Sequence, residues 1–172
     1  MHLERGRRTP ALGPVVPELT EEFPAGAVNF GVEYRDISGY KVPDFWEVPE
    51  GRLNDNGVTL HVFDALDGAE HIRMDCFWAD PHYHYSCPDS DEYLLVLYDA
   101  PANGEDMLGW AIDCFRSRLG PMLASTRGKH LAEKLNTALV AGALDQVEAA
   151  ARRMEENPPD IAPSPPIAGV TV

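Results

Sequence analysis

The chain has 172 residues, and its 28 Asp and Glu residues against 14 Lys and Arg residues give a formal net charge of -14. This length is enough for one hydrophobic core. So acidic a surface repels the phosphates of nucleic acids and of anionic lipids, and we expect neither as a partner. The sequence contains no apolar run of about 18 residues and no signal-peptide pattern, so we expect a cytoplasmic protein without a membrane span.

Prolines are concentrated towards the two ends of the chain, and residues 1–26 alone contain Pro10, Pro14, Pro17 and Pro24. Because proline fixes φ and lacks an amide hydrogen, helices and central strands are disfavoured there. We therefore expect an extended Pro-rich arm over 1–26 and a Pro-rich C-terminal tail over 158–172. Residues 27–157 are then expected to form a single domain.

Residues 27–99 are predicted to be rich in β-structure. Apolar and polar residues alternate over 28–35, as is typical of a half-buried strand. Three further apolar runs are predicted strands: 58–63, 71–78 and 92–98. Asp67-Gly68 marks a turn between two of them. Together these segments predict a small antiparallel meander of about three to five strands.

Residues 104–157 are predicted to be helical, because apolar residues recur there at helical spacing in three stretches. Gly120-Pro121 is expected to bend or end the first helix. Gly142 is expected to separate the second helix from a third, which stops before Asn157-Pro158. Strands followed by helices indicate an α+β fold, in which about three C-terminal helices pack on one face of the antiparallel sheet.

One segment, from Cys76 to Cys87, concentrates side chains that bind transition metals. His82 and His84 are two residues apart, so on extended backbone both imidazoles point to the same side. Together with Cys76 and Cys87 they could complete a tetrahedral site for zinc or another transition metal as cofactor. In a reducing compartment the 3 cysteines of the chain are expected to remain thiols.

Other residues could complete or support such a site. His61 and His71, in neighbouring predicted strands, are candidates for a missing ligand. Three aspartates could orient the imidazole N–H groups: Asp75, Asp80 and Asp89. The Cys-x5-His-x-His-x2-Cys spacing is not the two-residue cysteine knuckle of an ordinary structural zinc site. The competing interpretation is therefore a strand end whose histidines and tyrosines only pack and hydrogen-bond.

Three other chemistries compete for this segment. A Cys76 or Cys87 thiolate beside an imidazole could act as a nucleophile, but acidic surroundings raise a thiol pKa and argue against it. The His-x-His strand is similar to cupin metal sites, although the glutamate that follows stands at the wrong offset and the strands are too few. The third is a metal-free small-molecule pocket walled by aromatic residues: Phe77, Trp78, Tyr83 and Tyr85.

The residues Met74-Asp-Cys-Phe77, followed after three residues by Pro81-His-Tyr-His-Tyr85, resemble a signature of uncharacterised small bacterial proteins. The resemblance covers this segment alone, in the form D-C-F-x-x-x-P-H-Y-H-Y. It implies no activity and no site residue. It does imply that the segment is a unit.

Two functions of different classes follow from these observations. The first is a small accessory or structural subunit of a larger bacterial assembly, in which the Pro-rich arms bind a partner protein or another copy of the chain. Its basis is the two arms, the acidity and the lack of a recognisable catalytic motif. The alternative is a metal-dependent, zinc-type enzyme or metal-binding module built on His82 and His84, where an open coordination position would acidify bound water.

Overall fold

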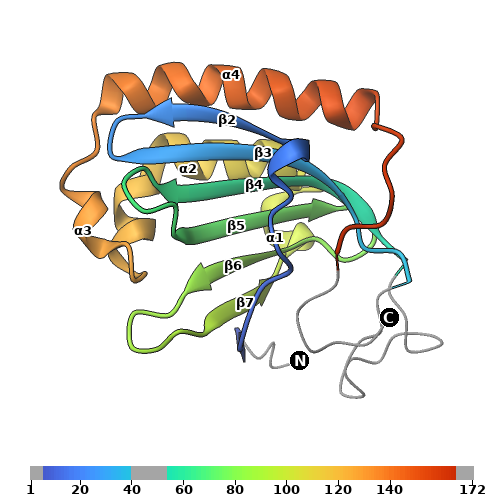
Figure 1. The fold of residues 1–172 in the computed structure, drawn as a ribbon, viewed down its shortest axis with the longest axis horizontal. Helices are drawn as coiled ribbons and strands as arrows, with labels where there is room; N and C mark the ends of the chain where they lie inside the picture. The colour runs from blue at the N-terminus through green and yellow to red at the C-terminus, as the bar shows by residue number, and fades with distance from the viewer. Residues whose placement is uncertain (1–5, 40–53, 166–172) are drawn as a thin grey trace.

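The computed structural model describes residues 6–39 and 54–165, and at its centre is a seven-stranded antiparallel sheet (Figure 1). The strands are β1 (Arg7–Thr9), β2 (Thr20–Ala25), β3 (Val28–Asp36), β4 (Asn56–Asp64), β5 (Glu70–Phe77), β6 (His82–Ser86) and β7 (Tyr93–Leu97). Their order across the sheet is β1-β7-β6-β5-β4-β3-β2. From β2 to β7 the sheet is thus a simple meander, and β1 alone joins out of chain order.

The helices follow the strands in the chain, and the two long ones pack on one face of the sheet. They are α1 (Ala100–Asn103), α2 (Met107–Ala124), α3 (Lys129–Ala132) and α4 (Thr137–Glu156). The α4 helix packs on β2, β3 and β4, whereas α2 packs on β5. Figure 1 shows α2 behind the sheet and α4 along its β2 edge. This arrangement confirms the predicted α+β fold with C-terminal helices on an antiparallel sheet.

Two positions were expected to interrupt helices, Gly120-Pro121 and Gly142, and the structure treats them differently. The backbone of Arg118 leaves helical geometry, at φ -147, three residues before Pro121, which bends α2 as predicted. The prediction that Gly142 ends a helix is wrong, because α4 runs through it without a break. A glycine inside a helix costs only about 1 kcal/mol. Two features of α4 offset that cost. The Asn136 side chain caps the first turn by accepting from the N–H groups of Ala138 and Leu139, and one face of the helix is buried.

The hydrophobic core lies between the sheet and the two long helices. Alternate residues of the central strands, including Phe30, Leu60 and Met74, point towards the helices and are fully buried. Phe115 on α2 and Leu144 on α4 meet them from the other side. The residues between these apolar positions must therefore face the opposite side of the sheet.

The N-terminal segment is part of the sheet, so the predicted free arm is not confirmed. The β1 strand pairs with β7 at one edge, and β2 pairs with β3 at the other edge, with Phe23 opposite Phe30. Edge strands tolerate proline, which explains Pro24 in β2. Between β1 and β2, residues 10–19 cross the sheet on the side opposite the helices and include a short 3-10 turn, η1 (Pro17–Leu19) (Figure 1).

The described part of the C-terminal tail returns to the sheet. Residues 158–165 form neither helix nor strand. Ser164 is buried at the end of β3, where its N–H donates to the Asp36 carbonyl at 2.7 Å and its Oγ accepts from the Asp36 N–H at 3.3 Å. The remainder of the predicted tail, 166–172, lies outside the described residues.

Within the ranges that the structure describes, no helix combines the length and the apolar character needed to cross a bilayer.

Candidate metal centre

The face of the sheet opposite the helices carries two adjacent rows of buried polar residues. Each row consists of residues that are cross-strand neighbours in β3 to β6. The first row is formed by Glu33, Thr59, Asp75 and His82. The second row is formed by His61, Arg73 and His84. None of the seven is more than 7% exposed. Because burying charge is costly unless each group is paired, the contacts within these rows decide whether the fold tolerates them.

Asp75, His82 and His84 converge at one end of the first row. The Asp75 Oδ2 atom lies 3.4 Å from Nε2 of His82 and 3.3 Å from Nε2 of His84. A carboxylate oxygen and one nitrogen of each imidazole all lie within 4.8 Å of one another. Among the described residues no other set of three His, Cys, Asp or Glu side chains is this close. We refer to Asp75, His82 and His84 as the triad.

Hydrogen bonds outside the triad orient two of its members. The Thr59 hydroxyl donates to Asp75 Oδ1 at 2.7 Å, which leaves Oδ2 directed at the imidazoles. The His82 Nδ1 atom lies 2.7 Å from the Asp80 carbonyl oxygen. Because a carbonyl oxygen only accepts, His82 Nδ1 must carry the proton that is donated. The Phe77 ring also packs edge-on against His82, with ring centroids 5.6 Å apart.

The charges of Asp75 and His84 follow from their burial and their neighbours. Burial alone would raise the pKa of Asp75, but the hydrogen bond from His84 and the charges of His82 and Arg73 hold that pKa well below its usual range. Burial lowers the pKa of His84 to about 4. At neutral pH an anionic carboxylate therefore lies beside a neutral imidazole. The Nδ1 atom of His84 is buried and has no hydrogen-bond partner among the residues that the structure describes.

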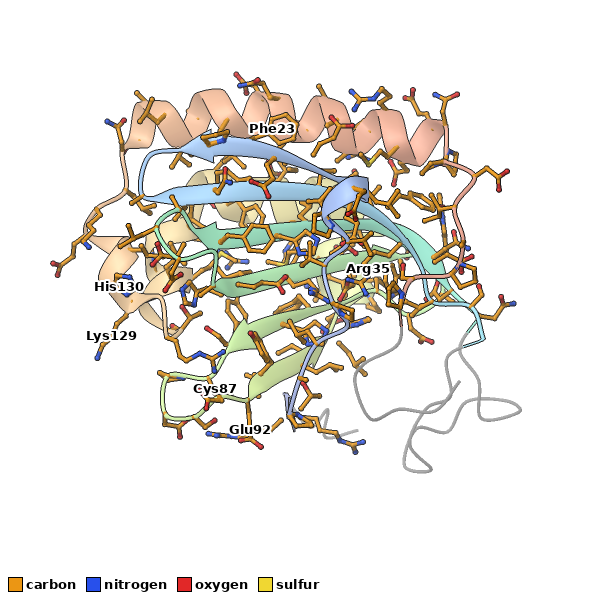
Figure 2. All side chains as sticks on the ribbon, viewed as in Figure 1. Phe23, Arg35, Cys87, Glu92, Lys129 and His130 are labelled. Atoms are coloured by element: carbon orange, nitrogen blue, oxygen red, sulfur yellow. The ribbon has the colours of Figure 1, made fainter. Side chains whose placement is uncertain are left out.

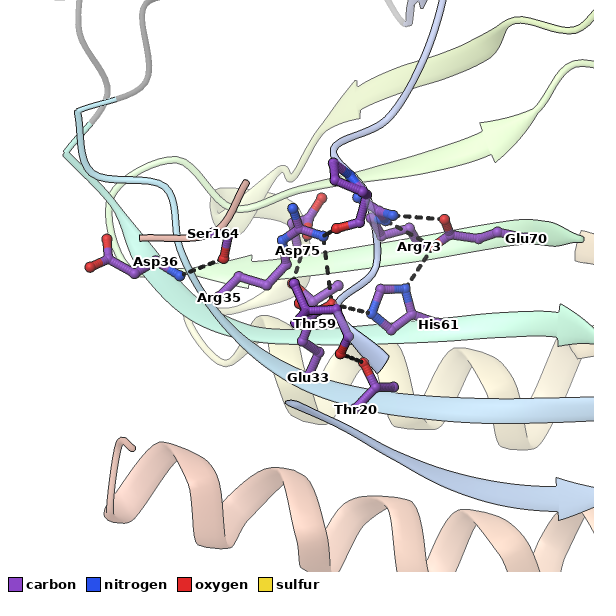
Figure 3. Close-up of polar contacts among 12 residues, drawn as sticks. Thr20, Glu33, Arg35, Asp36, Thr59, His61, Glu70, Arg73, Asp75 and Ser164 are labelled. Atoms are coloured by element: carbon purple, nitrogen blue, oxygen red, sulfur yellow. Dashed lines mark hydrogen bonds and ion pairs between the residues drawn. The ribbon is translucent and has the colours of Figure 1, made fainter. Parts of the chain in front are cut away.

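A chain of charged contacts continues along the same face (Figure 3). His61 Nε2 lies 3.2 Å from Glu33 Oε2, and His61 Nδ1 lies 2.6 Å from Glu70 Oε1. Glu70 accepts from Arg73 Nε at 2.8 Å and from Arg73 Nη2 at 2.7 Å. Arg35 Nη1 donates to the Pro14 carbonyl at 3.3 Å, which attaches the crossing segment to this face. We refer to Glu33, His61, Glu70 and Arg73 as the charged chain.

Acid should weaken the fold through Glu70. Burial alone would raise the pKa of Glu70, but Arg73 and His61 outweigh it and lower that pKa from 4.5 to about 2. Because the unfolded chain then takes up the proton first, the stability from Glu70 is complete above about pH 4.5 and disappears as the pH falls towards 2. The full loss should be about 3 kcal/mol, measured as the fall in free energy of unfolding by urea titration across this range.

Two glutamine variants isolate this contribution from the other carboxylates. Glu70→Gln should be less stable at neutral pH and should lose less stability than the parent between about pH 4.5 and pH 2. Glu133→Gln, which alters an exposed glutamate, should keep the parent's slope. Equal slopes in the parent and in Glu70→Gln would contradict the role given to Glu70.

The structure brings His82 and His84 together as the sequence predicts, but it places both cysteines elsewhere. Cys76 follows Asp75 on β5, so its side chain points to the helix face, where it packs against the core. Burial raises the pKa of Cys76 well above its usual range, which argues against a nucleophilic thiolate. Cys87 lies beyond the Ser86 end of β6, whereas His82 begins that strand (Figure 2). All 3 cysteines are free thiols.

The two other candidate histidines have different partners. His61 lies on the same face as the triad but is held between Glu33 and Glu70. His71 Nδ1 lies 3.1 Å from the Ser86 hydroxyl, away from the triad. Neither histidine therefore completes the site that His82 and His84 begin.

Asp75, the third member of the triad, was not predicted as a ligand from the sequence. It was expected to orient imidazole N–H groups, and its Oδ2 does contact both histidines, at 3.4 Å from His82 Nε2 and 3.3 Å from His84 Nε2. A signal was present, because Arg73 and Asp75 alternate with Ile72 and Met74 in a strand with one apolar face. What the sequence could not supply is the register that sets Asp75 opposite His82.

Comparison with known proteins identifies a family but no activity. A family model described as a domain of unknown function, DUF7700, matches residues 22–151. No curated protein and no solved structure matches the chain. The geometry of the polar sheet face therefore carries the functional argument.

Proposed function

Because the chain belongs to DUF7700, a family defined by a domain of unknown function, we propose its role from the geometry of the triad. The protein binds one divalent transition-metal ion, zinc before others, through Asp75, His82 and His84. The ion occupies a centre of the catalytic type. Three features support this proposal: the distances within the triad, the hydrogen bond made by His82, and the number of ligands.

The distances between triad atoms suit a tetrahedral ion. Ligand atoms at about 2.0–2.1 Å from one tetrahedral ion lie about 3.3 Å from each other. Asp75 Oδ2 lies 3.4 Å from His82 Nε2 and 3.3 Å from His84 Nε2. An octahedral ion with similar bond lengths needs adjacent ligand atoms about 3.0 Å apart. The two separations that involve Asp75 suit zinc, which takes nitrogen and oxygen ligands in tetrahedral geometry, and the imidazole nitrogens of His82 and His84 lie within 4.8 Å of each other.

The contact between His82 Nδ1 and the Asp80 carbonyl oxygen is the single observation that carries the proposal. The His82 Nδ1 proton is donated to the Asp80 carbonyl, so in the neutral ring Nε2 bears a lone pair. That lone pair faces Asp75 Oδ2, an atom of an anionic carboxylate. Two such atoms repel each other unless a positive charge lies between them, either a metal ion or a second proton on His82 Nε2 that makes the ring an imidazolium ion. Ring N–H donation to a backbone carbonyl is also how proteins orient histidines that bind metals.

The number of ligands supports a catalytic centre over a structural one. Structural zinc sites use four protein ligands, whereas catalytic sites use three and leave a position open. Within the described part of the chain three ligands converge. A bound ion of this kind supplies Lewis acidity and lowers the pKa of a coordinated water. The Thr59 hydroxyl fixes Asp75 in place, and the charged chain supplies further ionised groups on the same face.

The accessory-subunit hypothesis stays a prediction, but its structural basis is weaker. It relied on two extended arms that are free to wrap a partner. Residues 7–9 and 20–25 are instead strands of the sheet, and Ser164 in the tail is bound to Asp36. The arms contribute to the fold of this chain, so they are no longer evidence for a second protein.

Metal analysis of the gently purified protein tests the proposed centre. We expect about one equivalent of a transition metal per chain, with zinc prevailing, because two imidazoles and a carboxylate form its preferred site. His84→Ala removes one ligand and should lower the metal content to less than about a tenth of an equivalent. Inductively coupled plasma mass spectrometry of both proteins gives the answer directly.

A second histidine variant serves as the control. His130 is a half-exposed histidine that contacts Asp64 and lies outside the triad, so His130→Ala should keep the metal content of the parent. A parent protein without metal, which also fails to take up added zinc, would refute the proposed centre. An equal loss in both variants would assign the metal to a different or nonspecific site.

A further inference from the structure

A groove of about 670 Å³ lies at the strand ends next to α1, separate from the triad. It is bounded by the segment Phe77–Pro81 between β5 and β6, by the end of β7, by the start of α2 and by residues near the end of α4. Its volume falls within the range of about 300–1,000 Å³ that small-molecule sites occupy. None of the triad residues lines it. The groove is therefore a separate candidate binding site.

Large apolar side chains line this groove and remain open to solvent. Trp78 is 68% exposed and Leu97 is 58% exposed, and both are among the few large hydrophobic residues left uncovered. Tyr98 provides a second aromatic ring, which packs against Trp110 at a centroid distance of 5.1 Å. An exposed indole beside other apolar groups is typical of a surface that binds a ligand.

The charged residues of the groove have an excess of carboxylates. Among the described residues that line the groove, Arg152 is the one cation, and it is already paired with Asp106 at 2.5 Å and with Glu155 at 2.9 Å. Asp80 and Glu105 are exposed carboxylates that form no ion pair with any residue described. The groove thus combines aromatic surface with negative charge.

We propose that this groove binds a small organic cation, an ammonium or guanidinium compound with an apolar body. The exposed Trp78 ring provides the face on which a cation is attracted by the aromatic quadrupole. Asp80 and Glu105 supply the opposite charge, and the apolar walls accept the body of the ligand. The net charge of -14 also attracts cations to the surface as a whole. The proposal does not require metal binding, because no triad residue lines the groove; Asp80 adjoins both sites, since it lines the groove and its backbone carbonyl accepts from His82 Nδ1.

Three aromatic probes of equal size and different charge test this proposal: benzylamine, benzyl alcohol and benzoate. Each is titrated into the full-length protein at low salt while the indole N–H resonance of Trp78, assigned with Trp78→Phe, is followed by NMR. Benzylamine should shift this resonance to saturation in the millimolar range. Benzyl alcohol should bind at least about fivefold more weakly, because it lacks the charge, and benzoate should not bind.

Matched variants locate the site. Glu105→Gln should weaken benzylamine binding about threefold or more, whereas Glu133→Gln, the same change at an exposed glutamate outside the groove, should leave it unchanged. For both variants, benzylamine binding is measured by isothermal titration calorimetry and by the shift of the Trp78 resonance. No saturable shift with benzylamine, equal affinity for benzyl alcohol, or equal effects of the two variants would each overturn the proposal. Preference for a basic peptide over benzylamine would make the groove a protein contact and would overturn it as well.

Discussion

Replacing Arg73 with methionine should lower the free energy of unfolding by about 3–5 kcal/mol, because it leaves a buried carboxylate without its main partner. The Arg73 guanidinium donates to both oxygens of Glu70, and the side chains are only 3% and 10% exposed. Methionine fills much of the same volume, so the loss reports the charge and not a cavity. Urea unfolding followed by tryptophan fluorescence measures the difference.

Two further variants separate charge from packing. Removing both partners in Arg73→Met with Glu70→Met should cost less than Arg73→Met alone, since no isolated charge remains buried. Arg116→Met removes an exposed guanidinium that pairs with Asp145 and Glu148, and it should cost no more than about 1 kcal/mol. A double variant that is less stable than Arg73→Met would contradict this account.

The sequence indicates the central strands because their alternation is regular. In β3 and β5, apolar residues alternate with polar ones, and one face of each strand meets the helices. The edge strands could not be predicted in the same way. Prolines and charges obscure β1 and β2, and edge strands tolerate both. Their pairing depends on contacts with β7 and β3 that are distant in the chain or set by a turn.

The sequence indicates two of the three members of the triad for a similar reason. The spacing of His82 and His84 is local, and a strand places both rings on one face whatever surrounds it. Asp75 joins them only through the antiparallel register between β5 and β6. Cys76, one residue further on, was favoured by its ligand chemistry, yet strand alternation directs it into the core. Ligand chemistry suggests the residue types, whereas register decides which of them meet.

The polar face also explains why the N-terminal segment folds against the sheet. The side of the sheet that no helix covers presents polar side chains, which can hydrogen-bond to the backbone of a segment that lies on them. Residues 10–19 cross that side, and the Pro14 carbonyl accepts from Arg35 beside Glu33. Prolines suit a segment that crosses a sheet without pairing, because they need no partner for an amide hydrogen. The sheet, the crossing segment and the triad therefore form one arrangement.

Zinc should raise the free energy of unfolding of the metal-free protein by about 4 kcal/mol when its free concentration is about 1,000 times the dissociation constant. The folded chain holds Asp75, His82 and His84 together, whereas the unfolded chain does not, so the binding energy appears as stability. Thermal and urea unfolding of chelator-treated protein, with and without buffered zinc, measure the effect. The increase should grow with the logarithm of free zinc above the dissociation constant.

Substitutions in one row of the sheet assign this stabilisation to the triad. Asp75→Asn removes the anionic ligand and should reduce the zinc-dependent gain to less than about 1 kcal/mol. Glu33→Gln changes another buried carboxylate of the same row, two strands away, and should lower stability without reducing the gain from zinc. A gain of equal size in Asp75→Asn and in the parent would show that zinc binds elsewhere. The comparison holds even where both variants are less stable, because each one serves as its own metal-free reference.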